Sequence, residues 1–150
     1  MAAVPVVFAP LSRTIPRSAQ ICHRAFCAVE RTPEWLRILH SAMVTERDAL
    51  GRARRVAFLM RLRHATVGYT LHYRYRERDL RVTWGTPLRS ELRVHGYAQF
   101  SPLGDGSCLM TYGLELRKRG LPAFADSHFE GHAPSAVMAD FREFVLNAVR

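Results

Sequence analysis

The sequence predicts an α+β fold in which helices pack on one face of an antiparallel sheet. Apolar and polar residues alternate along most of the chain between residues 55 and 117, which is the pattern of strands with one buried face. Helical spacing of apolar residues precedes this region and returns at the C-terminal end. Turn-forming residues separate the alternating runs, so we expect consecutive strands to pair as neighbours.

The N-terminal part of the chain predicts a strand and then a helix. Val6 to Ile15 can form the strand if Pro10 lies at a sheet edge or in a bulge, because proline cannot donate a ladder hydrogen bond. Ser18 is a favourable N-cap residue for a helix over residues 18–29. The apolar residues that recur there at helical spacing are Ile21, Ala25, Phe26 and Val29.

A second short helix is predicted directly after the first. Thr32 provides an N-cap, and Pro33 provides the first helical position, where the missing N–H of proline costs nothing. We expect this helix to cover residues 33–39. Its apolar side consists of Trp35, Leu36 and Leu39.

Alternating runs in the middle of the chain predict the strands of an antiparallel meander. One face of this meander is apolar and the other is rich in arginine. The runs cover residues 55–63, 66–76, 80–84, 92–100 and 108–117. The turn residues between elements are Leu50-Gly51, Arg78-Asp79, Pro87 to Ser90, and Gly104-Asp105-Gly106.

A last helix is predicted over residues 135–149, lying across the concave face of the sheet. Gly131 and Pro134 interrupt the segment before it, so the helix either begins near Pro134 or kinks there. Its apolar stripe consists of Val137, Phe141, Phe144, Val145 and Ala148.

The composition is that of a soluble globular domain. The chain has 150 residues, of which 48% are hydrophobic and 23% charged, and this excludes a disordered chain. We expect one domain over residues 12–150, with residues 1–11 as an N-terminal extension or the start of the first strand. No apolar run approaches the roughly 20 residues of a transmembrane helix, and we find no signal peptide. We therefore expect a cytoplasmic protein.

Cysteine and histidine residues do not predict a metal centre. The three cysteines cannot form a disulfide framework, and no CxxC pair exists. Cys108 lies on the apolar side of its strand and is predicted to be a small core residue. The segment from His128 to His132 lacks the H-E-x-x-H spacing, and Gly131 weakens the helix that such a site needs. We expect neither a metal nor another cofactor.

Several segments together carry a family resemblance. They are Glu30-Arg31-Thr32-Pro33-Glu34-Trp35-Leu36, Val44-Thr45-Glu46-Arg47-Asp48 with Arg54-Arg55-Val56-Ala57-Phe58, Tyr69-Thr70-Leu71-His72-Tyr73-Arg74-Tyr75, Arg81-Val82-Thr83-Trp84, Gly96-Tyr97-Ala98-Gln99-Phe100 and Leu109-Met110-Thr111-Tyr112-Gly113-Leu114. Their order and spacing resemble the START-like superfamily, also called SRPBCC or helix-grip, and within it the polyketide cyclase/dehydrase and coenzyme Q-binding group. The resemblance implies a curved antiparallel sheet of about six to seven strands around the C-terminal helix. It also implies a strand at residues 44–48.

The resemblance implies that the space between the sheet and the last helix is often hollow. We therefore predict a pocket that binds or transports one hydrophobic molecule, such as a quinone, a lipid or a polyketide-like compound, without chemistry. Few charges project inward, which disfavours an acidic ligand, although a solidly packed sheet face would produce the same pattern. The predicted lining residues are Trp35, Phe58, Met60, Tyr69, Leu71, Tyr73, Trp84, Val94, Met110, Tyr112, Val137, Met138 and Phe141.

Two other functions stay open. Cyclases of the resembled group use inward Tyr, Arg or His side chains, so a metal-free polyketide cyclase, aromatase or dehydratase is the first alternative. A buried Tyr–Arg or Tyr–His pair beside a cavity would favour it. A ribosome-association toxin related to the quinone-binding group acts on an RNA-rich target, so a ribosome- or RNA-associated protein is the second.

The charge of the chain bears on the nucleic-acid alternative. Its net charge is +9, and a basic surface attracts phosphate polymers without specific design. We expect weak, non-specific anion binding and no specific nucleic acid, because the aromatic residues alternate onto the apolar face. The oligomeric state stays open. The outer arginines are Arg55, Arg61, Arg63, Arg74, Arg76, Arg81 and Arg93.

Overall fold

The computed structural model describes residues 6–61, 64–90, 92–118 and 133–148 of the chain. Its elements run from a first strand through two short helices and six further strands to a last helix. In chain order they are β1 (Val6–Ile15), α1 (Ala19–Cys27), η1 (Val29–Glu34), β2 (Leu39–Arg47), β3 (Ala53–Arg61), β4 (Thr66–Arg76), η2 (Glu77–Asp79), β5 (Arg81–Gly85), β6 (Leu92–Pro102), β7 (Cys108–Lys118) and α2 (Pro134–Ala148).

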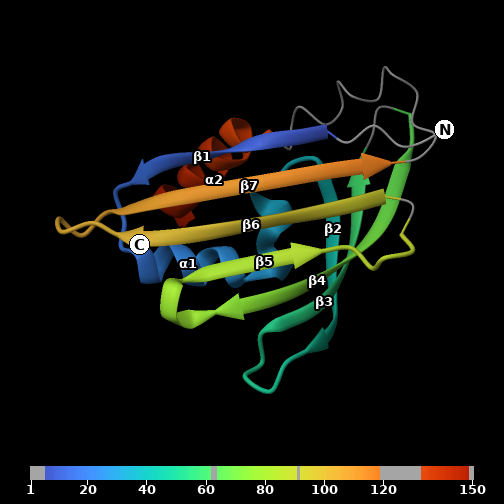
Figure 1. Cartoon of the computed structure of the whole chain (residues 1–150), viewed down its shortest axis with the longest axis horizontal. Coiled ribbons are helices and arrows are strands. Elements are labelled where there is room, and N and C mark those ends of the chain that lie inside the picture. The colour runs from blue at the N-terminus through green and yellow to red at the C-terminus, as the bar shows by residue number, and fades with distance from the viewer. Residues whose placement is uncertain (1–5, 62–63, 91, 119–132, 149–150) are drawn as a thin grey trace.

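All of these strands belong to one antiparallel sheet with the order β1-β7-β6-β5-β4-β3-β2. Strands β2 to β7 form a meander in which each strand pairs with the next along the chain, and β1 pairs with β7. Helix α1 contacts β6, and helix α2 contacts β1 and β7. In Figure 1 both helices lie behind the sheet. The predicted α+β helix-grip fold is therefore confirmed.

The alternation of residues determines which face of each strand is buried. In β6, for example, Leu92 and Val94 are buried whereas Arg93 and His95 are exposed. The five predicted runs agree with strands β3 to β7 to within two residues at either end, and the run 66–76 matches β4. Because side chains alternate with a period of two, a shift of one residue in strand pairing would turn the apolar residues away from the helices. The alternation therefore specifies the register.

The second predicted helix differs from the structure in position and type. Instead of a helix over residues 33–39, a 3₁₀ helix, η1, covers Val29–Glu34, with Pro33 inside it. The carbonyl of Thr32 accepts a hydrogen bond from the N–H of Trp35 at 3.1 Å, so Thr32 lies in the last turn and caps no new helix. Leu39 begins strand β2. The fixed φ of proline suits a 3₁₀ turn as well as the first turn of an α-helix.

Strand β2 lay outside the alternating runs, and only the family resemblance indicated it. Its pairing with β3 shifts register between Leu39 and Ser41, between Val44 and Glu46, and again between Glu46 and Arg47. A bulge adds an unpaired residue and changes which residues share a face. Burial still alternates from Ala42 to Arg47, but it does not follow hydrophobicity, because Met43 is exposed and Glu46 is half-buried.

Both α-helices are positioned by local signals that the sequence contains. The Ser18 side chain caps α1, because its hydroxyl accepts a hydrogen bond from the N–H of Ile21 at 3.2 Å. Helix α2 begins at Pro134, and the Phe141 side chain of its apolar stripe is fully buried. Gly131 lies outside the described residues. Among the helices of the described part of the chain, none is both long enough and apolar enough to cross a membrane.

Candidate functional site

Five aromatic side chains form a continuous row along the inner face of the sheet. Ring centroids are 5.5 Å apart between Tyr69 and Phe58, and 6.5 Å apart between Phe58 and Tyr73. The row continues from Tyr73 to Trp84 at 6.1 Å and from Trp84 to Tyr112 at 5.6 Å. These are the separations of interacting aromatic pairs. The structure thus brings together five of the residues that were predicted to line a pocket.

Glycine at position 96 allows this row to cross strand β6. Trp84 on β5 pairs directly with Gly96 on β6. A Cβ added at Gly96 would lie 2.7 Å from the Trp84 ring and 2.8 Å from the carbonyl oxygen of Gly113. The indole therefore lies over bare backbone, and it reaches Tyr112 on β7 without an intervening side chain.

The side chains of Tyr73 and Tyr112 are buried, and that of Tyr69 is half-buried. Burial raises the pKa of each of the three phenols well above its usual value, so all three are neutral at physiological pH. Tyr69 and Tyr112 also contribute to the raised pKa of Tyr73, which shows that the three groups lie close enough to interact. Among the described residues, no hydrogen bond joins any of these hydroxyls to another group. Tyr73 and Tyr112 retain exposed fractions of 8% and 4%, so a water-sized molecule can touch the row.

Phe26 of α1 was not predicted to line the site, yet it is the centre of a second aromatic cluster. Its ring centroid lies 5.5 Å from that of Trp84, 5.7 Å from that of Trp35 and 5.4 Å from that of Phe141. The rings of Trp35 and Phe141 are in turn 5.1 Å apart. At this end, Phe26 fills the space between the sheet and α2. The helical stripe that contains Phe26 was the available signal, because the buried side of α1 faces the same sheet.

The other predicted lining residues lie in the buried core. They are Met60, Leu71, Val94, Met110, Val137 and Met138. The buried indole N–H of Trp35 has no hydrogen-bond partner within the described chain. Tyr69 is only half-buried, unlike the remaining predicted residues. Cys108 is fully buried, as predicted.

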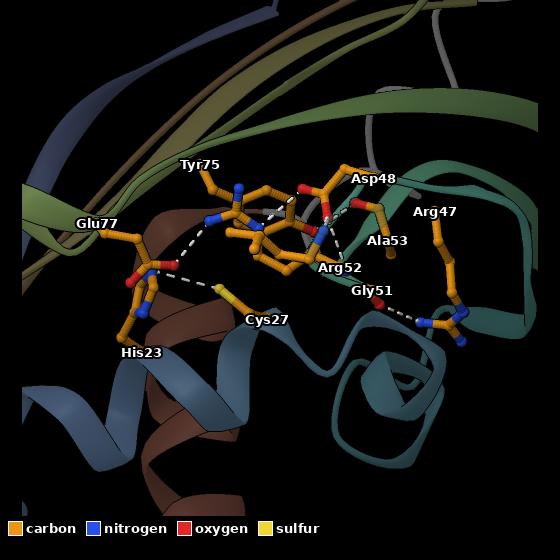
Figure 2. Close-up of polar contacts among 10 residues, drawn as sticks. His23, Cys27, Arg47, Asp48, Gly51, Arg52, Ala53, Tyr75 and Glu77 are labelled. Carbon is orange, nitrogen blue, oxygen red and sulfur yellow. Dashed lines mark hydrogen bonds and ion pairs between the residues drawn. The ribbon is translucent and has the colours of Figure 1, made fainter.

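A hollow of about 400 Å³ lies between α1 and the turn that joins β2 to β3. Figure 2 shows its polar wall, in which Arg52 is held on both sides by carboxylates. The Nε of Arg52 donates to Oδ2 of Asp48 and its Nη1 donates to Oε1 of Glu77, each at 2.8 Å. The guanidinium carbon also lies 4.7 Å from the centre of the Tyr75 ring. This network ties the β2–β3 turn to the end of β4.

His23 and Cys27 form the inner wall of the same hollow. The Nε2 of His23 and the Sγ of Cys27 are 3.4 Å apart (Figure 2). Burial raises the pKa of Cys27 to about 12 and lowers the pKa of His23. At neutral pH the pair is a protonated thiol beside a neutral imidazole, and so it lacks the thiolate of a cysteine nucleophile. Besides burial, the Cys27 thiol makes a small contribution to the raised pKa of Tyr73.

A buried Tyr–Arg pair beside a cavity was the feature expected to favour an enzyme, and Tyr75 with Arg52 is a half-buried pair of this kind. However, the Tyr75 hydroxyl donates to the carbonyl of Ala53 at 2.5 Å, and Arg52 already binds two carboxylates. A general acid must offer its proton to the reacting group, whereas this proton is held by the backbone. The pair therefore cross-links the turn and has no free proton for acid catalysis.

The outer face carries the expected arginines, and no metal cluster accompanies them. In the described ranges, no group of three or more His, Cys, Asp or Glu side chains could hold a metal ion. The segment from His128 to His132 lies outside those ranges, as does Arg63. Arg81 is half-buried. The exposed outer arginines are Arg55, Arg61, Arg74, Arg76 and Arg93.

Comparison with known proteins identifies the fold. No protein-family model and no curated protein sequence matches the chain. Among solved structures, a START superfamily protein from Mycobacterium smegmatis superposes with a TM-score of 0.80 at 13% identity, covering 96% of this chain and all of that one. The Zhui aromatase/cyclase from a Streptomyces species has a TM-score of 0.65 at 9% identity, covering 97% and 86%. Truncated norcoclaurine synthase from Thalictrum flavum has a TM-score of 0.64 at 14% identity, covering 100% and 98%.

These structural matches, together with the geometry described above, place the chain among proteins with a helix-grip fold, here with an aromatic inner face. More particularly, its fold is START-like, of the SRPBCC type, as the sequence resemblance implied. Identities this low show the fold alone, since one fold can host many unrelated functions.

Proposed function

We propose that this chain binds one uncharged hydrophobic molecule that carries a carbonyl or hydroxyl oxygen, between the inner face of the sheet and α2, without transforming it. The observation that carries the proposal is the group of three neighbouring tyrosine hydroxyls, on Tyr69, Tyr73 and Tyr112, that belong to largely buried side chains and have no hydrogen-bond partner among the described residues. Buried polar groups are nearly always hydrogen-bonded. A ligand oxygen would provide the missing acceptor, and a bound water would take its place in the empty site.

The inner face favours an uncharged ligand. The buried polar side chains of the described chain are His23, Thr32 and Ser107, and the lowered pKa of His23 keeps its imidazole neutral. An anion moved to this face would lose its hydration without gaining a cation. A carbonyl loses less and accepts a hydrogen bond from a phenol.

The walls favour a flat ring system of variable outline. The aromatic row offers ring faces and edges for stacking. Met60, Met110 and Met138 are buried beside the row, and methionine adapts to ligands of different shapes because its side chain is flexible and polarizable. Quinones and polyketide-like compounds combine such rings with carbonyl oxygens.

The proposal is tested by titrating ubiquinone-1 into the protein and following quenching of its tryptophan fluorescence. We expect saturable quenching, and an affinity about fivefold weaker in Tyr73→Phe, because one hydrogen bond contributes roughly 1 kcal/mol. Tyr97→Phe is the matched control, since Tyr97 lies on the outer face beside Arg81. Equal losses in both variants, or no saturable quenching, would contradict the proposal.

A second experiment identifies the natural ligand. Native mass spectrometry of protein purified from its own host would reveal a retained lipophilic molecule as a mass increment that disappears on unfolding. Tyr73→Phe is expected to retain less of it than Tyr97→Phe does. A retained anionic compound would contradict the argument from desolvation.

A cyclase or dehydratase activity is the second candidate, because the neutral imidazole of His23 lines the hollow between α1 and the β2–β3 turn. A neutral imidazole beside a ligand can accept a proton. The Zhui aromatase/cyclase has the same fold, which adds support without assigning the reaction. Incubation with a linear poly-β-ketone, followed by mass spectrometry for dehydrated or cyclised products, tests it. His23→Asn should abolish such products if His23 is the base.

A further inference from the structure

We propose a second binding site, on the outer face of the sheet, that holds the phosphoryl group of a small organic phosphate. A hollow of about 410 Å³ opens there over strands β4, β5 and β6. Side chains of His72, Arg74, Thr83 and His95 line it, and the loop after β5 forms its rim. Trp84 of the aromatic row also borders the hollow, but these four side chains lie on the opposite face of the sheet from that row. The inference is independent of the function proposed above.

A missing side chain creates the space in this hollow. Gly85 pairs with His72 on one neighbouring strand and with His95 on the other. Neighbouring strands are about 4.8 Å apart, so the Cα atoms of the two histidines lie about 10 Å apart with no side chain between them. A Cβ at Gly85 would meet only the Cδ2 of His95 at 3.4 Å and the carbonyl oxygen of Val94 at 3.8 Å.

The hollow presents hydrogen-bond donors from several sides. Arg74 lies two residues from His72 on the same face of β4, directly opposite Thr83. Among the described residues, neither the Arg74 guanidinium nor the Thr83 hydroxyl makes a hydrogen bond or ion pair. The Nε of Arg55 donates to Nε2 of His72 at 3.4 Å. In the neutral ring this leaves the Nδ1–H of His72 as a donor.

The charges around the hollow complement an anion. Among the described residues that line it, none is acidic. Arg74 lines the hollow, and Arg55 on β3 and Arg93 on β6 lie on the same face of the sheet. The acidic neighbours are Glu46, which pairs with Arg55 at 3.3 Å, and Glu115 on β7, which lies opposite His95. A phosphoryl group offers three strong acceptor oxygens, whereas a carboxylate offers two, so it can engage more of the donors that line the hollow.

The rim explains why we infer an organic phosphate and not the free ion. The Nη1 of Arg93 donates to the carbonyl of Leu88 at 2.9 Å, and Thr86 and Val94 exchange hydrogen bonds at 2.9 and 3.1 Å. This part of the loop is thereby tied to β6. It holds the apolar side chain of Leu88 beside the hollow with an exposed fraction of 82%. An apolar or aromatic group attached to the phosphate would cover that side chain.

The site is tested by NMR, with ¹H–¹⁵N spectra recorded during titration with inorganic phosphate and with adenosine monophosphate. Sodium chloride is used to keep the ionic strength constant, and acetate serves as the comparison anion. We expect shifts confined to residues 72–74, 83–88 and 95, with adenosine monophosphate binding more tightly than phosphate and phosphate more tightly than acetate.

Three variants separate a built site from diffuse charge. Arg74→Gln should weaken binding about tenfold or more, the effect of losing a charge-assisted hydrogen bond. Gly85→Leu keeps every charge but fills the hollow, and should weaken binding similarly. Arg142→Gln is the control, because Arg142 is an exposed arginine on α2, and it should bind as the unchanged protein does. Thermal unfolding followed by circular dichroism establishes that each variant is folded.

Several results would overturn the inference. Equal weakening by Arg74→Gln and Arg142→Gln would show a response to net charge only, and so would equal binding of acetate and phosphate. Adenosine monophosphate that binds no more tightly than inorganic phosphate would refute the organic-phosphate assignment. Tight binding of a short single-stranded RNA that Gly85→Leu leaves unchanged would replace the pocket by a general nucleic-acid surface.

Discussion

Tyr73 and Tyr75 lie on the same strand, and their rings are 6.4 Å apart, but their hydroxyls differ in one respect that mutation can measure. Tyr75 donates to the carbonyl of Ala53, whereas the Tyr73 hydroxyl has no partner among the described residues. Tyr75→Phe leaves a buried carbonyl without its donor and should cost about 1–3 kcal/mol. Tyr73→Phe removes an oxygen that has no described partner from a largely buried side chain, and it should leave stability unchanged or raise it by up to about 1 kcal/mol.

Urea unfolding of the ligand-free protein, followed by circular dichroism, measures both free energies of unfolding. The two variants should therefore differ by about 2 kcal/mol, although each loses only one oxygen atom. In titrations with ubiquinone-1, Tyr73→Phe should bind more weakly than Tyr75→Phe, although it is the more stable of the two variants. A loss above about 1 kcal/mol for ligand-free Tyr73→Phe would refute the reasoning, because it would mean that the protein itself satisfies this hydroxyl.

Three further predictions follow from packing and burial. Phe141→Ala should cost about 3–5 kcal/mol in chemical denaturation, because a fully buried aromatic ring is truncated; a loss well under 1 kcal/mol would show that α2 does not pack as described. Gly96→Ala should cost about 1–3 kcal/mol, since its Cβ would press on the Trp84 ring, whereas Gly104→Ala, with nothing within 4 Å, is the neutral control. Cys27, with its pKa raised to about 12, should react with iodoacetamide at pH 8 on the order of a thousandfold more slowly than a free thiol, and unfolding in urea should remove the difference.

Sequence predicted those elements whose signal is local and regular. Strand β4 was predicted with its observed bounds because polar and apolar residues alternate from Thr66 to Arg76 without a break. Strand β2 contains three register shifts, and its exposed Met43 and half-buried Glu46 do not follow the alternation of apolar and polar residues. The Thr32-Pro33 pair is equally suited to starting an α-helix and to a 3₁₀ turn, so tertiary packing decided between them.

The site was predicted in part for the same reason. The alternation of side chains along the strands predicted that Tyr69, Tyr73 and Tyr112 share one face of the sheet. The structure brings them together there. Phe26 was missed as a neighbour of that face, because a helix stripe shows which side is buried but not which ring it meets. The ion pair between Arg52 and Glu77 joins residues 25 positions apart, and no local sequence pattern predicts such a pair.

The pairing of the first strand with β7 affects how the molecule is made. The hydroxyls of Ser12 and Thr111 are hydrogen-bonded at 2.8 Å although 99 positions separate them. The ribosome releases residues in chain order, so β1 emerges long before β7, the strand with which it pairs. Contacts across so long a separation form late and slow folding, and an unpaired strand is prone to join other chains in the meantime. During synthesis, β1 is thus the segment that a chaperone would have to shield until β7 has left the ribosome.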